Sequence, residues 1–200
     1  SQNGAPYFKY LFLVDNKPFL VHSSEGVLEW ETSAFNRIDQ DSFFDRIDDI
    51  QFIKHYQSNT FILGTENGNL YTFNKAFENF KPLKTEADPY LKEHNLTNGT
   101  VLNDGSVGLT TLAGWFVIVN KRGEWIQLLN KKADLPANYV IAAHQSPKGA
   151  IWLAMNSGIA RIEFLLLTFE YPLQSVDCLP FSNRRDSKQK SSNRCDHLRT

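Results

Sequence analysis

The chain has 200 residues, of which 42% are hydrophobic, 13% aromatic and 22% charged, and its formal net charge is −1. This composition is that of a globular protein with a buried core, and the near-zero charge argues against nucleic-acid or anionic-membrane binding driven by electrostatics. No apolar run approaches the roughly 18 residues of a membrane span, and the first four residues lack the features of a signal peptide. The two cysteines, Cys178 and Cys195, predict neither a disulfide framework nor a metal cluster.

Four segments share one spacing, which indicates an internal repeat. Each has a polar turn, an apolar strand, a short polar loop ending in glycine and a second apolar strand. The loop glycines are separated by 42, 46 and 44 residues, and a turn residue stands nine positions before each of them. The glycines are Gly26, Gly68, Gly114 and Gly158, and the turn residues are Lys17, Asn59, Gly105 and Gly149.

The pieces between these markers are predicted to be strands. Residues 11–14, 61–63 and 151–153 are short apolar runs, typical of strands covered on both faces. Residues 28–31 and 160–164 alternate apolar with polar, which predicts one buried and one wet face. Aromatic side chains further along each repeat are expected on outer strands (Phe35, Phe77, Trp125), and three tryptophans are expected in packing between repeats (Trp30, Trp115, Trp152).

A period of about 40 to 50 residues with four strands each is that of a β-propeller blade. We therefore expect an all-β protein, a β-propeller of about four blades of four antiparallel strands over residues 1–164. The best helical segment, residues 85–94, is short and contains Pro89, so we interpret it as an insertion between the second and third blades.

Residues 165–200 form an atypical C-terminal segment. Residues 165–181 are apolar enough for one or two strands that cover the edge of the last blade. Residues 182–200 contain six basic and two acidic residues and no aromatic residue, so they are expected to be partly disordered. They are either a basic tail that binds an acidic partner or an end without a selected function.

Three stretches resemble the two-component regulator propeller repeat. Residues 135–140 read Leu-Pro-Ala-Asn-Tyr-Val, residues 148–153 place Trp152 after a Lys-Gly turn, and residues 156–161 begin Asn-Ser-Gly. Residues 59–68 match the second half of the repeat, whereas Gly108 and Leu20 replace its usual tryptophan. The resemblance covers about residues 7–164.

That family implies large propellers in the periplasmic sensor half of hybrid histidine kinases and related regulators, which sense extracellular compounds, frequently glycans. The resemblance thus implies a periplasmic, non-enzymatic ligand-sensing module without a cofactor, whose ligand is a small molecule or glycan. Four blades are fewer than is usual in the family. Three interpretations stay open: a fragment, a small four-bladed ring, or a partial ring completed by another chain.

The sequence lacks the residue patterns typical of catalytic and metal-binding sites. The five histidines do not have metal-ligand spacing, and no cysteine cluster accompanies them. Carboxylate pairs such as Asp48 and Asp49 are better explained as solvated turn residues, since glycosidase chemistry needs two carboxyl groups facing each other. We therefore predict no catalytic residue and no metal site.

If a ligand binds, propeller geometry places it at the loops between second and third strands and between blades, which lie on one face. The candidate ligand-binding residues are Ser24, Glu25, Glu66, Asn67, Asn98, Asn138, Asn156 and Ser157. Two other functions remain: a propeller lyase or hydrolase acting on a polysaccharide, and a protein-interaction scaffold. Open blade edges are hazards for aggregation, so self-association through the ends is expected.

Overall fold

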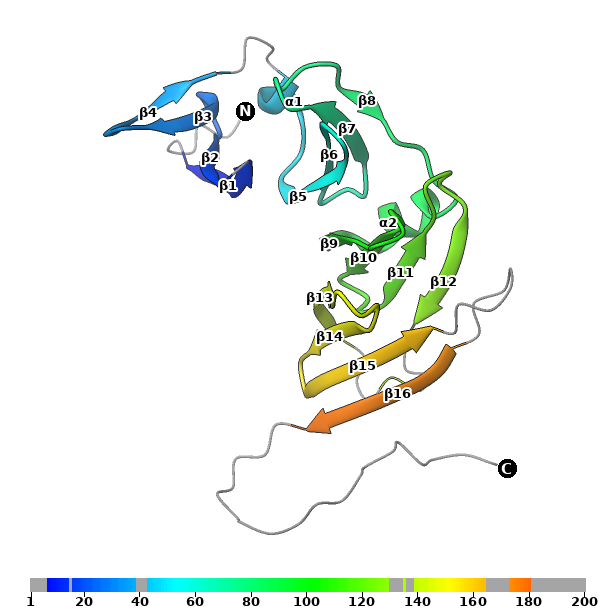
Figure 1. Ribbon diagram of the computed structural model, residues 1–200. Helices are drawn as coiled ribbons and strands as arrows, with labels where there is room; N and C mark the ends of the chain where they lie inside the picture. Colours follow the sequence, from blue (N-terminus) through cyan, green and yellow to red (C-terminus); the bar gives the residue numbers. More distant parts are fainter. Residues whose placement is uncertain are drawn as a thin grey trace, which may run out of the picture. The chain divides into compact units, whose positions relative to one another are not determined.

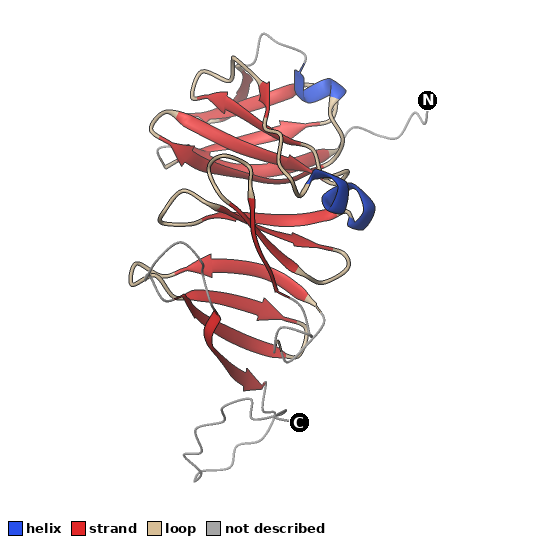
Figure 2. Ribbon diagram, turned by 90° about the vertical axis from the view of Figure 1, so that its right-hand side faces the viewer, coloured by secondary structure: helices blue, strands red, loops and turns tan. Residues whose placement is uncertain are grey.

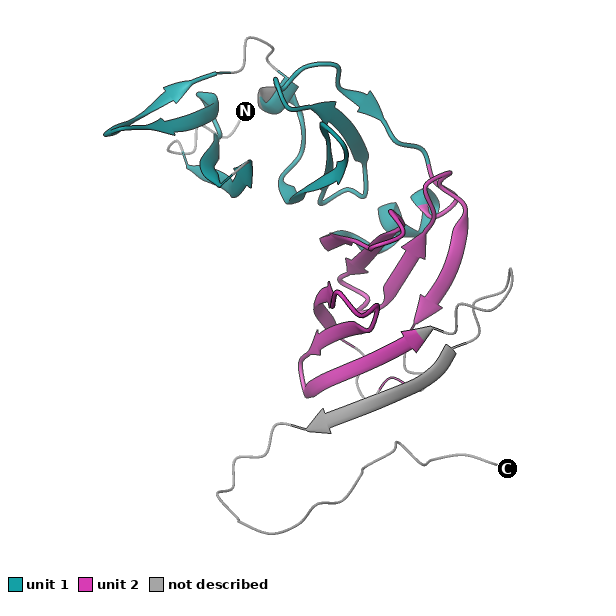
Figure 3. Ribbon diagram, viewed as in Figure 1, with its two compact units in different colours: residues 1–84, 88–96 teal, residues 85–87, 97–200 magenta. Residues whose placement is uncertain are grey.

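The structure is a computed structural model that describes residues 7–14, 16–38, 43–129, 135, 139–164 and 173–180. For residues 173–180 it describes the backbone only. Strands dominate these residues (Figures 1 and 2). The chain divides into two compact units, residues 1–84 with 88–96 and residues 85–87 with 97–200 (Figure 3).

Unit 1 contains two four-stranded antiparallel sheets whose strands follow one another in chain order. Blade 1 consists of β1 (Phe8–Val14), β2 (Lys17–His22), β3 (Gly26–Glu31) and β4 (Ala34–Arg37). Blade 2 consists of β5 (Ile50–Gln57), β6 (Thr60–Thr65), β7 (Leu70–Asn74) and β8 (Lys81–Pro82). The short helix α1 (Phe43–Arg46) precedes β5, and α2 (Asp88–His94) follows β8.

Unit 2 contains two further sheets of the same order, although Leu96, the first residue of β9, is assigned to unit 1. Blade 3 consists of β9 (Leu96–Val101), β10 (Val107–Thr111), β11 (Phe116–Val119) and β12 (Trp125–Leu129). Blade 4 consists of β13 (Val140–Gln145), β14 (Ile151–Met155), β15 (Gly158–Phe164) and β16 (Leu173–Pro180). The prediction of four blades of four antiparallel strands is confirmed.

Two segments outside the repeats also behave as expected. The predicted insertion is α2, which lies between the last strand of blade 2 and the first strand of blade 3. Its Pro89 stands in the first turn, where the missing N–H disturbs no helical hydrogen bond. The strand predicted within residues 165–181 is β16, which pairs with β15 at the edge of blade 4. Residues 182–200 lie outside the described residues.

The repeat markers do not all have the same structural position. Gly68 and Gly114 end their loops, and their N–H groups donate to the carbonyls of Thr65 and Thr111. Gly26 and Gly158, in contrast, are the first residues of β3 and β15. Lys17 was predicted to be a turn residue, but it begins β2 and pairs with Val14. The third strand therefore begins at the glycine in blades 1 and 4 and two residues after it in blades 2 and 3, although the spacing of nine is constant.

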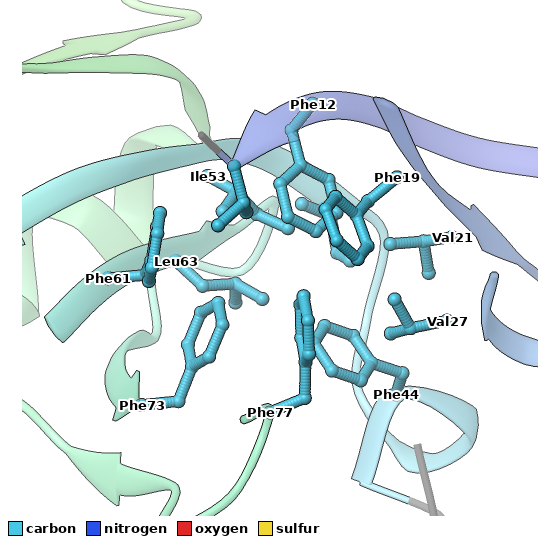
Figure 4. Packing of buried hydrophobic residues seen from close by; sticks show 12 residues of the cluster. Phe12, Phe19, Val21, Val27, Phe44, Ile53, Phe61, Leu63, Phe73 and Phe77 are labelled. Carbon is cyan, nitrogen blue, oxygen red and sulfur yellow. The ribbon is translucent and has the colours of Figure 1, made fainter. Parts of the chain in front are cut away.

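Aromatic packing between the two blades forms the core of unit 1 (Figure 4). Phe12 and Phe19 of blade 1 stack on each other, with ring centroids 5.6 Å apart. Phe61 and Phe73 of blade 2 stack at 5.6 Å. Phe77 joins the two pairs, because its ring lies 5.1 Å from Phe19 and 5.8 Å from Phe73. Each blade thus covers the apolar face of the other.

Two predictions about this core were wrong. Phe77 was expected on an outer strand, but it follows β7 in a turn with φ of 58° and is buried between the blades. Residues 11–14 were expected to be covered on both faces, but only Phe12 and Val14 are buried, whereas Leu11 and Leu13 are 62% and 64% exposed. The run is apolar throughout, so its hydrophobicity did not reveal which face has a neighbour.

The core of unit 2 is mostly aliphatic. Phe116, Ile118 and Leu129 of blade 3 pack with residues of blade 4, among them Leu153 and Ile162. The predicted alternation in β15 is confirmed for residues 160–163, since Ala160 and Ile162 are fully buried while Arg161 and Glu163 are partly exposed.

Leu63 tests the packing between blades because its side chain is fully buried in the core of unit 1. Leu63→Ala should lower the free energy of unfolding by about 2–5 kcal/mol, since it removes buried methyl groups and leaves a cavity. The matched control is Leu112→Ala, because Leu112 is 48% exposed, and it should change stability by less than about 0.5 kcal/mol. Urea unfolding followed by circular dichroism measures both, and equal effects would contradict the assignment of this core.

Candidate functional site

The loops between second and third strands lie at the same end of the blades as the starts of the first strands. In blade 1 the N–H of Ser23 donates to the carbonyl of Tyr7 (2.9 Å). In blade 2 the N–H of Glu66 donates to the carbonyl of Asp49 (2.8 Å). In blade 4 the N–H of Asn156 donates to the carbonyl of Tyr139 (3.2 Å). The predicted shared loop edge therefore exists within each unit.

Further backbone hydrogen bonds form at this edge within each unit. The N–H of Leu96, at the start of β9, donates to the carbonyl of Glu66 in blade 2 (2.9 Å). The N–H of Val140, at the start of β13, donates to the carbonyl of Gly114 in blade 3 (3.0 Å). Backbone hydrogen bonds thus hold the loops in place and leave side chains available for other contacts.

In blade 1 the loop side chains gather around His22. The Ser24 hydroxyl lies 3.2 Å from Nδ1 of His22, and the Ser24 N–H donates to the same nitrogen at 3.4 Å. The carboxylate of Glu25 lies 4.0 Å from Nδ1. His22 is buried, whereas Ser24 and Glu25 are exposed. The structure therefore brings together the two candidate residues Ser24 and Glu25, with a histidine beneath them.

The residues that begin the inner strands add groups that sequence reasoning missed. The Tyr7 hydroxyl donates to the carboxylate of Asp49 (3.2 Å), and the Tyr7 N–H donates to the Ser23 hydroxyl (2.9 Å). The negative charge of Asp49, together with this hydrogen bond, raises the pKa of the Tyr7 phenol. The two residues are 42 positions apart, so only the packing of blade 1 beside blade 2 reveals the pair.

The second loop of unit 1 contains the candidates Glu66 and Asn67. Glu66 is half-buried and its backbone lies between Asp49 and Leu96, with a hydrogen bond to each. Asn67 is exposed at the tip of the loop. Glu66 is therefore suited to shaping the loop, and Asn67 to meeting a ligand from solvent.

Unit 2 holds the remaining candidates. Asn156 and Ser157 are exposed in the loop between β14 and β15, as predicted. Asn98 was expected in a loop, but it lies within β9, where its side-chain oxygen accepts from the N–H of Gly99 (2.8 Å). The strand begins at Leu96, which the loop of blade 2 binds, so the chain is already extended at Asn98. Asn138 lies outside the described residues.

A cavity of about 400 Å³ opens at the opposite end of unit 2, between the turns 103–106 and 146–150. Leu102, Ile118, Ile126 and Ile151 form its apolar lining, and Asp104, Lys148 and Glu163 contribute charged groups. The side chain of Gln145 joins the two turns, because its oxygen accepts from the N–H of Asn103 and its amide donates to the carbonyl of Gly149 (2.6 and 2.8 Å). None of the candidate residues that the structure describes lines this cavity.

The described residues contain neither a metal site nor a membrane-spanning helix. Among those residues, no three His, Cys, Asp or Glu side chains lie close enough together to hold a metal ion. Neither α1 nor α2, the helices in that part of the chain, has the length and hydropathy to span a membrane.

Comparison with known proteins finds similarity in structure rather than in sequence. The sequence matches no protein-family model, and no curated protein matches it either. The extracellular domain of the putative hybrid two-component system BT3049 from B. thetaiotaomicron has a TM-score of 0.58 at 15% identity, with 80% of this chain and 21% of that chain covered. YCF48 bound to D1 peptide has a TM-score of 0.55 at 16% identity, covering 79% and 49%.

A third similar structure is the Swd1 β-propeller domain of Myceliophteria thermophila, with a TM-score of 0.52 at 12% identity, covering 80% of this chain and 54% of that chain. The chain thus spans about one fifth of the BT3049 domain and about half of the other two chains. These structures confirm the all-β propeller fold.

The Tyr7–Asp49 pair can be tested by titrating the phenols. In a difference titration of the chain against Tyr7→Phe by near-ultraviolet absorbance, the phenol of Tyr7 should ionise above the ordinary tyrosine pKa of about 10. Asp49→Asn should move that transition down toward the ordinary value, because the carboxylate that opposes the phenolate is gone. An unchanged transition in Asp49→Asn would show that the two side chains do not interact.

Proposed function

We propose that this chain is the ligand-recognition part of an extracellular or periplasmic sensor and that it performs no catalysis. The observation that carries the proposal is the loop edge of unit 1, defined as residues 7–8, 22–25, 49 and 66–67. There, exposed polar side chains stand beside exposed aromatic rings on a backbone held by hydrogen bonds. The fold shared with extracellular domains of hybrid two-component systems supports a role in signalling.

The ligand class follows from the chemistry of this edge. Tyr7 and Phe8 are 52% and 68% exposed and offer flat apolar faces. Glu25 and Asn67 offer carboxylate and amide groups that exchange hydrogen bonds with hydroxyls. Sugar rings present an apolar face and a rim of hydroxyls, so this combination suits an oligosaccharide. Asn156 and Ser157 form the corresponding loop in blade 4, and with Asn98 and Asn138 they are proposed as ligand contacts within unit 2.

A calorimetric titration of the chain with a panel of neutral oligosaccharides tests the proposal. Tyr7→Ala should weaken binding roughly tenfold, because it removes a stacking ring worth about 1 kcal/mol or more. Glu25→Gln should weaken it less, since the amide retains one hydrogen-bonding oxygen. Chromatography of the mixture after incubation should recover the oligosaccharide intact. Cleaved product would favour the lyase or hydrolase instead.

The control variant is Lys148→Ala, which alters the cavity of unit 2 and leaves the loop edge untouched. It should bind oligosaccharide as the unmodified chain does. If Lys148→Ala abolishes binding while Tyr7→Ala has no effect, the ligand occupies the cavity and the loop edge is not the site. If no oligosaccharide binds the folded chain, the proposed ligand class is wrong.

A further inference from the structure

The cavity of unit 2 is separate from the loop edge and large enough for a ligand of its own. It measures about 400 Å³ and lies between the turns 103–106 and 146–150. A cavity of about 150 Å³ accepts a benzene ring, and small-molecule sites typically measure about 300–1,000 Å³. The volume therefore suits an aliphatic chain of medium length or a ring with a short side chain.

Hydrogen bonds fix the two turns that frame the cavity. Each turn is closed by the N–H of a glycine, Gly105 in the first and Gly149 in the second, at 2.8 and 2.9 Å. Asn103 of the first turn then joins the second, because its N–H donates to Oε1 of Gln145 and its side-chain amide donates to the carbonyl of Ser146 (2.6 and 3.1 Å). The frame is therefore built before a ligand arrives, which lowers the entropic cost of binding.

The inner wall of the cavity is apolar. Leu102, Ile118 and Ile151 line it, are at most 7% exposed and belong to the core of unit 2. Ile126 also lines it and packs against the same core. Because these side chains offer no hydrogen bond to water, the wall favours a hydrocarbon group.

Three charged side chains line the cavity, and two of them already have partners. The carboxylate of Asp104 accepts from the N–H and the hydroxyl of Ser106 (2.9 and 3.0 Å). The carboxylate of Glu163 pairs with the guanidinium of Arg161. The ammonium of Lys148, in contrast, has no hydrogen-bond or ion-pair partner among the described residues. The charge that a ligand can neutralise here is therefore positive.

A second ammonium lies beside the first turn. A Cβ on Gly105 would collide with Cε of Lys121 and would lie 3.1 Å from its Nζ, so the lysine side chain crosses this turn. Lys121 and Lys148 are both exposed. Their positive charges at the frame of the cavity attract an anion from solution.

We propose that the cavity of unit 2 binds an amphipathic monocarboxylate, with its hydrocarbon chain against Ile118 and Ile151 and its carboxylate at Lys148. The chain replaces water at an apolar wall, and the carboxylate supplies the partner that the ammonium lacks. A cation of the same shape would instead compete with Ser106 and Arg161 for carboxylates that are already bonded.

This site is independent of the oligosaccharide proposed for the loop edge. The two ligands differ in class, and the residues that line the cavity include none of those assigned to the loop edge. Either proposal can therefore fail while the other holds.

Calorimetric titration of the chain with octanoate, octanol and octylammonium tests the sign of the charge, because the three ligands share one hydrocarbon chain. Octanoate should bind saturably, with a single molecule per chain. Octanol should bind roughly fivefold more weakly, since an ion pair at an exposed rim contributes modestly. Octylammonium should bind most weakly, because it meets the ammonium of Lys148.

Two variants locate the site. Lys148→Met keeps an unbranched apolar side chain and removes the charge, so octanoate should bind roughly fivefold more weakly and octanol as before. Ile126→Trp should weaken both ligands about tenfold or more, because the indole ring fills part of the cavity. Lys54→Met is the matched control, since Lys54 is an exposed lysine of β5 in unit 1, and it should bind octanoate as the unmodified chain does. If circular dichroism shows Ile126→Trp to be unfolded, Lys148→Met, which changes an exposed side chain, decides alone.

Three results would overturn the proposal. A folded chain without saturable octanoate binding has no such site. Octylammonium that binds as tightly as octanoate means that Lys148 does not select the ligand. Octanoate binding that survives in Lys148→Met and is lost in Tyr7→Ala means that the ligand occupies the loop edge instead of the cavity.

Discussion

The structure depends on one constraint, that the apolar face of a blade must be covered by a neighbouring blade. In unit 1 this is met by aromatic rings from five strands and turns, with Phe12 and Phe19 against Phe61, Phe73 and Phe77. In unit 2 smaller aliphatic side chains meet the same need. Because a sheet cannot bury its faces alone, each blade derives its stability from its neighbour more than from its own hydrogen bonds.

The packing of blades also builds the proposed recognition surface. In blades 1, 2 and 4 the start of the first strand meets the loop of its own blade, and the start of β13 also meets the loop of blade 3. Backbone groups make these contacts, so loop side chains such as Glu25 and Asn67 can vary without loss of the fold. This division between a conserved type of scaffold and variable loops is how propellers present different sites on one architecture.

The loop edge and the side of blade 1 are separate surfaces. The loop edge lies at the ends of the strands, whereas the exposed Leu11 and Leu13 lie along the side of β1 that faces away from blade 2. Phe8 belongs to the loop edge, where its ring centroid lies 5.4 Å from that of His22 and the two residues pair in the sheet.

Local chemistry determined the features that each repeat carries within itself. The spacing of glycines and turn residues, the alternation in β15 and the position of Pro89 predicted the four blades, their hairpins and the insertion of α2. The loops that hold Ser24, Glu25, Glu66, Asn67, Asn156 and Ser157 followed from the same spacing. All of these features depend on residues that are close in the sequence, so the sequence alone is enough to predict them.

Only the tertiary structure decided which faces are covered and which distant residues meet. Leu11 and Leu13 are as hydrophobic as Phe12 and Val14, yet they are exposed because no described residue packs over them. Phe77 leaves its expected strand because the space between two blades accepts its ring, and Asn98 lies in a strand because blade 2 binds the start of β9. Tyr7 reaches Asp49 across 42 residues for the same reason. The burial of a side chain depends on which blade packs against its face of the sheet. The repeat pattern predicts the strands of a blade but not the blade that packs against each face.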